Sequence, residues 1–96
     1  MKGYLIATVR VDDPDGYEAY RCRTREIIER HGGRFLVRGG ELAVLEGDWQ
    51  PSRLVVLQFE DLAAAKRWYD SEAYQQARQL REGAAHLRMV AVQGVE

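Results

Sequence analysis

The chain contains one cysteine, Cys22, and two histidines among its 96 residues. A single cysteine cannot form a disulfide within the chain, and the histidine and cysteine spacings predict no structural zinc site. This cysteine usage fits a reducing compartment, so we expect a cytoplasmic protein. We also expect neither a metal ion nor a cofactor.

The chain has almost no excess of either charge: it contains 14 Lys and Arg and 15 Asp and Glu, which gives a formal net charge of -1. Binding to nucleic acid or to an anionic membrane through a general electrostatic field requires a basic balance, so we expect neither partner. No apolar run approaches the roughly 18 residues that span a bilayer, and the N-terminus leads into a strand-like stretch without a signal segment. The length predicts a single domain over residues 1–96.

Apolar periodicity and helix-capping residues predict alternating strands and helices. The β-branched stretch from Tyr4 to Val11 predicts a strand. Asp13 and Pro14 then predict the start of a helix that runs to about His31. One stripe of this helix is expected to face the core, and it comprises Tyr17, Tyr20, Thr24, Ile27, Ile28 and His31.

Two alternating runs, RFLVR and ELAVLE, flank the pair Gly39 and Gly40. This pattern predicts a β-hairpin whose two-residue turn needs positive φ. Arg38 then lies beside Glu41 across the hairpin. The glycines are not expected to form a phosphate-binding loop, because such loops lead into a helix and a strand follows here.

The second half of the chain predicts strands from Leu54 to Phe59 and from Leu87 to Val95. Between them, Asp61 and Ser71 are expected to cap two helical stretches. The inner stripes comprise Leu62, Ala65 and Tyr69, with Trp68 at the edge, in the first stretch, and Ala73, Tyr74, Ala77, Leu80 and Ala84 in the second.

This order of elements predicts an α+β, ferredoxin-like sandwich, in which an antiparallel sheet carries its helices on one face. Several strands are apolar on both faces, so the uncovered face would expose a large apolar patch. A second copy of the same sheet is the simplest cover. We therefore expect a homodimer whose two sheets close into a dimeric α/β barrel.

The chain resembles the bacterial domain-of-unknown-function family 1330 (DUF1330), of the dimeric α/β-barrel superfamily, in the segments DPDGYEAY, GGRFLVRGG, VLEGDWQPSRLVVLQF, WYDSEAYQQARQLR and VAVQGV. The resemblance covers nearly the whole chain. It implies a ferredoxin-like homodimer with a cleft between sheet and helices. It implies no single activity, because the superfamily includes cofactor-free monooxygenases, isomerases, haem-binding enzymes and ligand-sensing modules.

Three arginines are candidates for binding an anionic ligand in such a cleft. Arg38 either pairs with Glu41 or directs its guanidinium at a carboxylate or enolate. Arg81, on the inward side of its helix, either extends its charge to the surface, pairs with an acid or binds an anion. Arg53 lies with Trp49 in the loop before a strand, where the indole either lines the pocket or anchors the loop.

Aromatic side chains on inward helical faces are further candidates, with plain core packing as the alternative. Glu46 is a candidate general base, although solvation of a turn also accounts for it. His86 is a candidate base or, as in some relatives of the superfamily that the chain resembles, a haem ligand, although a single histidine without a second ligand is a weak signal for haem. The aromatic candidates are Tyr17, Tyr20, Trp68, Tyr69 and Tyr74.

Two functions from different classes remain open. The first, slightly favoured, is a small homodimeric, cofactor-independent enzyme acting on a small anionic or aromatic metabolite. The alternative is a non-catalytic dimer that binds or senses a small molecule. An acid or base beside a buried arginine favours catalysis, whereas an apolar cavity with only peripheral arginines favours binding.

Overall fold

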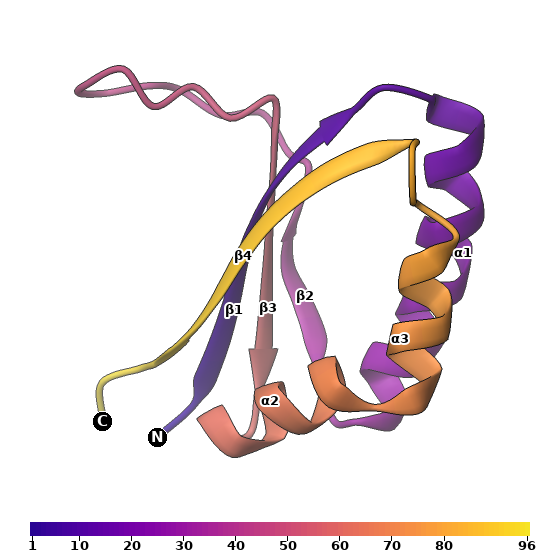
Figure 1. Cartoon of the computed structure of the whole chain (residues 1–96). Coiled ribbons are helices and arrows are strands. Elements are labelled where there is room, and N and C mark those ends of the chain that lie inside the picture. The colour runs from indigo at the N-terminus through magenta and orange to yellow at the C-terminus, as the bar shows by residue number, and fades with distance from the viewer.

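The computed structural model describes all 96 residues and shows one four-stranded antiparallel sheet in the order β2-β3-β1-β4, with three helices on one face (Figure 1). The predicted ferredoxin-like α+β architecture is therefore confirmed. None of the helices has the length and apolar character needed to cross a membrane. The elements are β1 (Gly3–Val11), α1 (Pro14–Arg30), β2 (Arg34–Arg38), β3 (Arg53–Phe59), α2 (Leu62–Asp70), α3 (Glu72–Gln79) and β4 (Ala85–Gln93).

The residues predicted to cap the helices do so. The Asp13 carboxylate accepts a hydrogen bond from the backbone N–H of Asp15 at 3.2 Å. The Asp61 carboxylate accepts one from Ala64 at 2.7 Å, and the Ser71 hydroxyl caps α3 in the same way. These side chains satisfy backbone donors that a helix start leaves without a partner. The local sequence alone thus fixes where each helix begins.

The third helix is shorter than predicted. It ends at Gln79, whereas the sequence placed its end near Ala84, and Leu80, expected inside, is 43% exposed. The backbone carbonyl oxygen of Ala84 accepts hydrogen bonds from the N–H groups of Asp12 and Asp13 at 2.8 and 2.9 Å. This tertiary contact holds the chain in a turn toward β4, so the helix cannot continue.

The core lies between the helices and the inner face of the sheet. Trp68, expected at the edge of α2, is 1% exposed and stacks against Tyr74 with ring centroids 4.2 Å apart. The residues predicted for the inner stripe of α1 are buried, apart from His31, which follows the helix as its C-cap. The core cluster comprises Leu5, Ala7, Val9, Tyr17, Tyr20, Ile27, Ile28, Leu57, Phe59, Ala64, Ala65, Trp68, Tyr74, Ala77 and Ala85.

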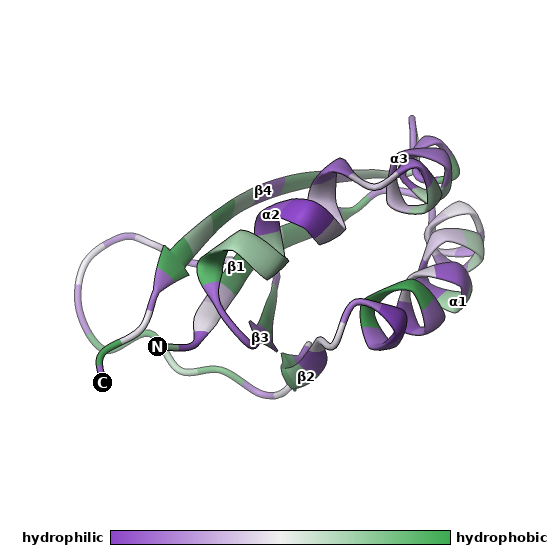
Figure 2. Ribbon diagram, turned by 90° about the horizontal axis from the view of Figure 1, so that it is seen from below, coloured by the Kyte–Doolittle hydropathy of each residue, from purple (hydrophilic) through white to green (hydrophobic).

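The opposite face of the sheet is covered by no element of the chain (Figure 2). The strand register places Ile6 of β1 beside Val56 of β3 and Val90 of β4. Val90 and Val92 are 62% and 46% exposed. The apolar residues on this side are therefore contiguous and reach the solvent. We call this surface the open face, and its apolar members are Tyr4, Ile6, Val37, Leu54, Val56, Val90 and Val92.

The predicted hairpin between RFLVR and ELAVLE is wrong. Arg38, the last residue of β2, pairs with Val55 of β3, and the N–H of Gly39 donates to the carbonyl oxygen of Leu54 at 2.9 Å. Because β3 occupies the position beside β2, the run ELAVLE has no strand to pair with. Residues 40–52 instead leave the sheet as an extended arm that projects away from the helices (Figure 1). We call this segment the arm.

Candidate functional site

A narrow cleft lies between α1 and the inner face of the sheet. Its volume is about 40 Å³, which accommodates roughly three water molecules. Twelve of its 16 lining residues are hydrophobic, and the four polar ones are Arg21, Thr24, Arg38 and Arg53. The cleft is thus an apolar space with three guanidinium groups among its walls.

Three different elements bring these arginines together. Arg21 lies on α1, Arg38 ends β2 and Arg53 begins β3, so Arg53 is not in a loop as the sequence predicted. Gly39 makes room for the Arg53 side chain, because a Cβ at that position would lie 2.6 Å from its Nη1 atom. The sheet register and this glycine together place Arg53 at the cleft.

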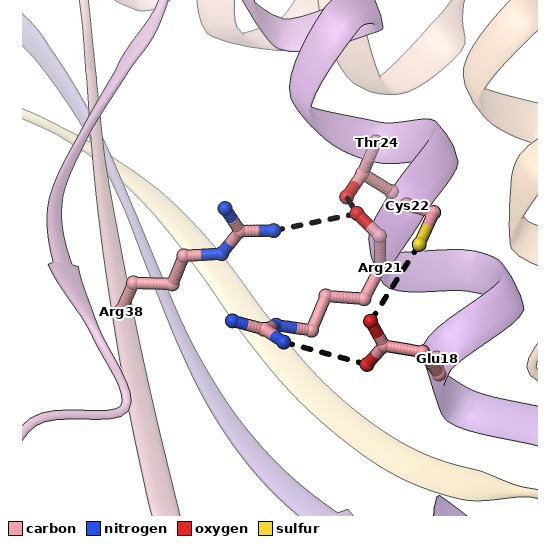
Figure 3. Close-up of polar contacts among 5 residues, drawn as sticks. All are labelled: Glu18, Arg21, Cys22, Thr24 and Arg38. Carbon is pink, nitrogen blue, oxygen red and sulfur yellow. Dashed lines mark hydrogen bonds and ion pairs between the residues drawn. The ribbon is translucent and has the colours of Figure 1, made fainter. Parts of the chain in front are cut away.

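Few acceptors surround the guanidinium groups of Arg21 and Arg38 (Figure 3). Arg38 donates through Nη2 to the backbone carbonyl oxygen of Arg21 at 3.3 Å. Arg21 itself pairs with the carboxylate of Glu18 at 3.3 Å. The predicted pair of Arg38 with Glu41 is wrong, because β3 takes the place of the second hairpin strand and Glu41 lies in the arm. Arg38 therefore has no carboxylate partner.

The electrostatic environment opposes the charge of Arg38. Burial lowers the pKa of Arg38 below its ordinary value, and the positive charges of Arg21, Arg25 and Arg53 lower it further. The Nε atoms of Arg21 and Arg53 are buried without a hydrogen-bond partner. Buried donors normally have acceptors. The cleft thus combines concentrated positive charge with donors that an anion can satisfy.

Aromatic residues form another part of the wall. Tyr17, Tyr20 and Trp68, all predicted site residues, line the cleft. The indole Nε1 of Trp68 is also buried without an acceptor. Phe35 stacks under the Arg38 guanidinium at 4.2 Å from its ring centroid. Flat apolar surfaces and unpaired donors are therefore close together in one small space.

The remaining candidates lie elsewhere. Arg81 and His86 line a polar hollow near the end of α3, and Tyr69 lines a mainly apolar hollow between α2 and β4. Tyr74 is fully buried. Burial lowers the pKa of Arg81, but the neighbouring hydroxyls of Tyr74 and Tyr20 raise it by more, so the net direction is upward. Glu46 and Trp49 lie in the arm.

Arg21 and Thr24 are cleft residues that we did not predict as candidates. A signal was present, since Arg21 follows Tyr17 by four residues and precedes Thr24 by three, which puts all three on one side of a helix. An arginine on a stripe that otherwise faces the core requires a partner or a function. The position of Arg21 on the same helical stripe as Tyr17 and Thr24 could therefore have identified it as a site candidate.

The cleft offers hydrogen-bond donors and no carboxylate or histidine. Its hydroxyls come from Tyr17, Tyr20 and Thr24. Burial raises the pKa of Tyr20 well above its ordinary value, and the hydrogen-bonded Tyr74 raises it further, so this phenol stays protonated at neutral pH. No group of three or more His, Cys, Asp and Glu side chains is placed to hold a metal ion. This arrangement is suited to holding an anion with an apolar body.

Comparisons with known proteins agree with this architecture. The model of the family described as "Domain of unknown function (DUF1330)" matches residues 2–95. The RPA0582 protein of unknown function from Rhodopseudomonas palustris has a similar structure, with 21% identity and a TM-score of 0.72, covering 99% of this chain and 83% of the other. No protein of curated function matches this sequence.

Two further solved structures resemble the chain. SnoaB, a cofactor-independent oxygenase from Streptomyces nogalater, is 13% identical with a TM-score of 0.64, covering 99% of this chain and 94% of the other. A dimeric ferredoxin-like protein of unknown function from Thermobifida fusca is 16% identical with a TM-score of 0.61, covering 98% and 92%. At these identities the likeness shows the fold alone.

Proposed function

The chain belongs to the DUF1330 family, and we propose that its cleft binds a small organic anion with a planar apolar body, such as an aromatic carboxylate. One observation carries this proposal. Three guanidinium groups meet at an apolar cleft, and Glu18 is the one carboxylate that pairs with any of them. A ligand carboxylate supplies the missing negative charge and accepts hydrogen bonds from Arg38 and Arg53.

The rest of the wall matches the apolar part of such a ligand. Phe35, Leu57 and Met89 line the cleft from three strands, and Tyr17 and Trp68 offer aromatic surfaces. Sites for drug-sized ligands usually measure roughly 300–1,000 Å³, so this cleft must widen when a ligand enters. We expect the Arg38 side chain to move, since a single hydrogen bond of 3.3 Å holds its guanidinium.

A cofactor-independent enzyme is the second candidate. The same guanidinium groups stabilise an enolate or phenolate that forms from a bound substrate. SnoaB, which shares the fold, is a cofactor-independent oxygenase. We rank binding first because no carboxylate or histidine lines the cleft to take a proton from a substrate.

We further propose that the chain forms a homodimer through the open face. A contiguous apolar surface of this kind is unfavourable in contact with water, and a second copy covers it symmetrically. The protein from Thermobifida fusca that shares this fold is described as dimeric. Sedimentation of wild type and Val90→Asp tests this, and we expect the variant to be monomeric.

A cytoplasmic location stays a prediction.

Titration with benzoate and 1-naphthoate, followed by protein NMR and calorimetry, tests the cleft. Losing a charge-assisted hydrogen bond costs about 1.5–3 kcal/mol, so we expect Arg38→Met to bind 1-naphthoate at least about tenfold more weakly. Arg30→Met is the matched control, because the side chain of Arg30, at the end of α1, is 62% exposed and pairs with Glu26 at 3.9 Å. Equal affinities in the three proteins, or no binding by wild type, overturn the proposal.

Recovery of the bound compound separates the two candidate functions. Binding alone predicts that a retained phenolic or carboxylate ligand is recovered unchanged, with no oxygen consumed. Turnover of the ligand, measured by mass spectrometry and an oxygen electrode, favours the enzyme.

A further inference from the structure

The arm, residues 40–52, makes no backbone hydrogen bond within the chain. The last such bond before it runs from the N–H of Gly39 to the carbonyl oxygen of Leu54, and no N–H or carbonyl between Gly40 and Ser52 is paired. An extended segment with unpaired backbone groups has the properties of an edge strand, which readily adds to another sheet.

The side chains of the arm are apolar and exposed. Leu45 is 94% exposed and Trp49 is 62% exposed, while Leu42 and Val44 are also accessible. Together with Leu54 they surround a hollow of about 310 Å³. Leu54 belongs to the open face, so the arm extends that apolar surface beyond the edge of the sheet.

The charges of the arm are of one sign. It contains Glu41, Glu46 and Asp48 and neither lysine nor arginine. Arg34 and Arg88 lie on the open side of the two edge strands, are exposed and form no ion pair within the chain. An acidic, apolar arm and an apolar face with basic edges are complementary.

We propose that the arm binds a second copy of this chain. In the dimer that closes over the open face, the arm of each copy packs beside β4 of the other, buries Leu45 and Trp49 there, and brings its acidic residues to Arg88 of that copy. This inference rests on the homodimer proposed above. The new element is the reciprocal exchange of arms, since two sheets can pack face to face without it.

Geometry allows this exchange. Half of the arm, about six residues at 3.3 Å each, reaches roughly 20 Å, whereas packed sheets lie about 10 Å apart. An arm that leaves the edge of the open face therefore extends past the sheet of a second copy. A two-fold axis makes both arms equivalent, so each acidic arm meets one basic edge.

Trp49 provides a direct measurement. Trp68 is 1% exposed, so a change of tryptophan emission or iodide quenching on self-association reports on Trp49. We expect Trp49 in wild type to become less accessible to iodide as the dimer forms in a dilution series, while Trp49→Phe shows no change. Equal quenching of Trp49 in monomer and dimer overturns the proposal.

Leu45→Ser tests the energetic contribution of the arm. The side chain is almost fully exposed within one copy, so folding of the monomer is preserved, and we expect dimer dissociation to become about tenfold easier. Leu80→Ser, 43% exposed on the helical side, is the control and leaves dimerisation unchanged.

The variants separate the proposals. If Val90→Asp abolishes the dimer while Leu45→Ser does not weaken it, the arm exchange is overturned and the homodimer stands. If wild type sediments as a monomer at all concentrations, both fall. Binding of 1-naphthoate in the cleft is measured separately and tests neither.

Discussion

The guanidinium of Arg38, at the end of β2, donates a hydrogen bond at 3.3 Å to the backbone carbonyl oxygen of Arg21 on α1, and both side chains line the apolar cleft between these elements. Glu18 forms an ion pair with Arg21 and with neither of the other two cleft arginines. Burial lowers the pKa of Arg38, and the neighbouring positive charges lower it further. We expect an anion bound in the cleft to relieve this repulsion.

We expect a repulsive coupling between Arg21 and Arg38. In a double-mutant cycle with Arg21→Met and Arg38→Met, the coupling energy should be about 0.5 kcal/mol in the direction of repulsion. It should shrink as sodium chloride is added, because salt screens exposed charges. Urea unfolding of the four proteins at low and high salt measures it, and an attractive coupling contradicts the prediction.

The buried hydroxyl pair of Tyr20 and Tyr74 should stabilise the contact between α1 and α3. Their oxygens are 2.9 Å apart. Tyr74→Phe leaves the Tyr20 hydroxyl buried without its partner, which should reduce the free energy of unfolding by about 1–2 kcal/mol. Tyr69→Phe is the control, because the Tyr69 hydroxyl makes no hydrogen bond in the chain, and equal losses in the two variants exclude a role for the pair.

Stability should decrease at alkaline pH because of Tyr20. Burial raises the pKa of Tyr20 in the folded state, whereas the unfolded chain titrates at about 10. Below that pH the contribution is complete. Above it the unfolded chain releases a proton that the folded protein retains, so the free energy of unfolding falls as the pH rises. We expect Tyr20→Phe to show a shallower fall in urea unfolding between about pH 9 and about pH 11.

Gly3 should not tolerate a side chain. A Cβ at Gly3 would lie 2.6 Å from the backbone nitrogen of Leu62 and would also contact the backbone of Asp61. Backbone atoms at the start of a capped helix cannot move aside easily, so Gly3→Ala should cost about 1–3 kcal/mol. Gly40→Ala meets no atom within 4 Å and should change stability by less than about 0.5 kcal/mol. Thermal and urea unfolding of both variants provide the comparison.

The fold was largely predictable because its signals are local. Asp13, Asp61 and Ser71 begin helices wherever the chain places them, since a cap acts on backbone groups two or three residues away. The β-branched composition of residues Tyr4 to Val11 predicted a strand, and β1 spans Gly3–Val11. The ferredoxin-like arrangement follows from the order of these elements.

The site was predictable only in part. Arg38, Arg53, Tyr17, Tyr20 and Trp68 were candidates and line the cleft. Their role as a binding site stays a prediction. Other candidates, such as Trp49 and Arg81, lie outside the cleft. Their sequence positions could not predict this, because helical periodicity and proximity in sequence do not tell which of several hollows a side chain enters.

The sequence by itself determined the helix starts, the two-sided apolar strands and the family to which the chain belongs. Only the tertiary structure decided what happens after Arg38. The run ELAVLE has every local property of a hairpin strand, but β3 competes for the same edge of β2 and pairs with it. Strand pairing is a contact between distant segments, so its outcome depends on which partner the whole sheet provides. That competition frees the arm and places Arg53 beside Arg38 at the cleft.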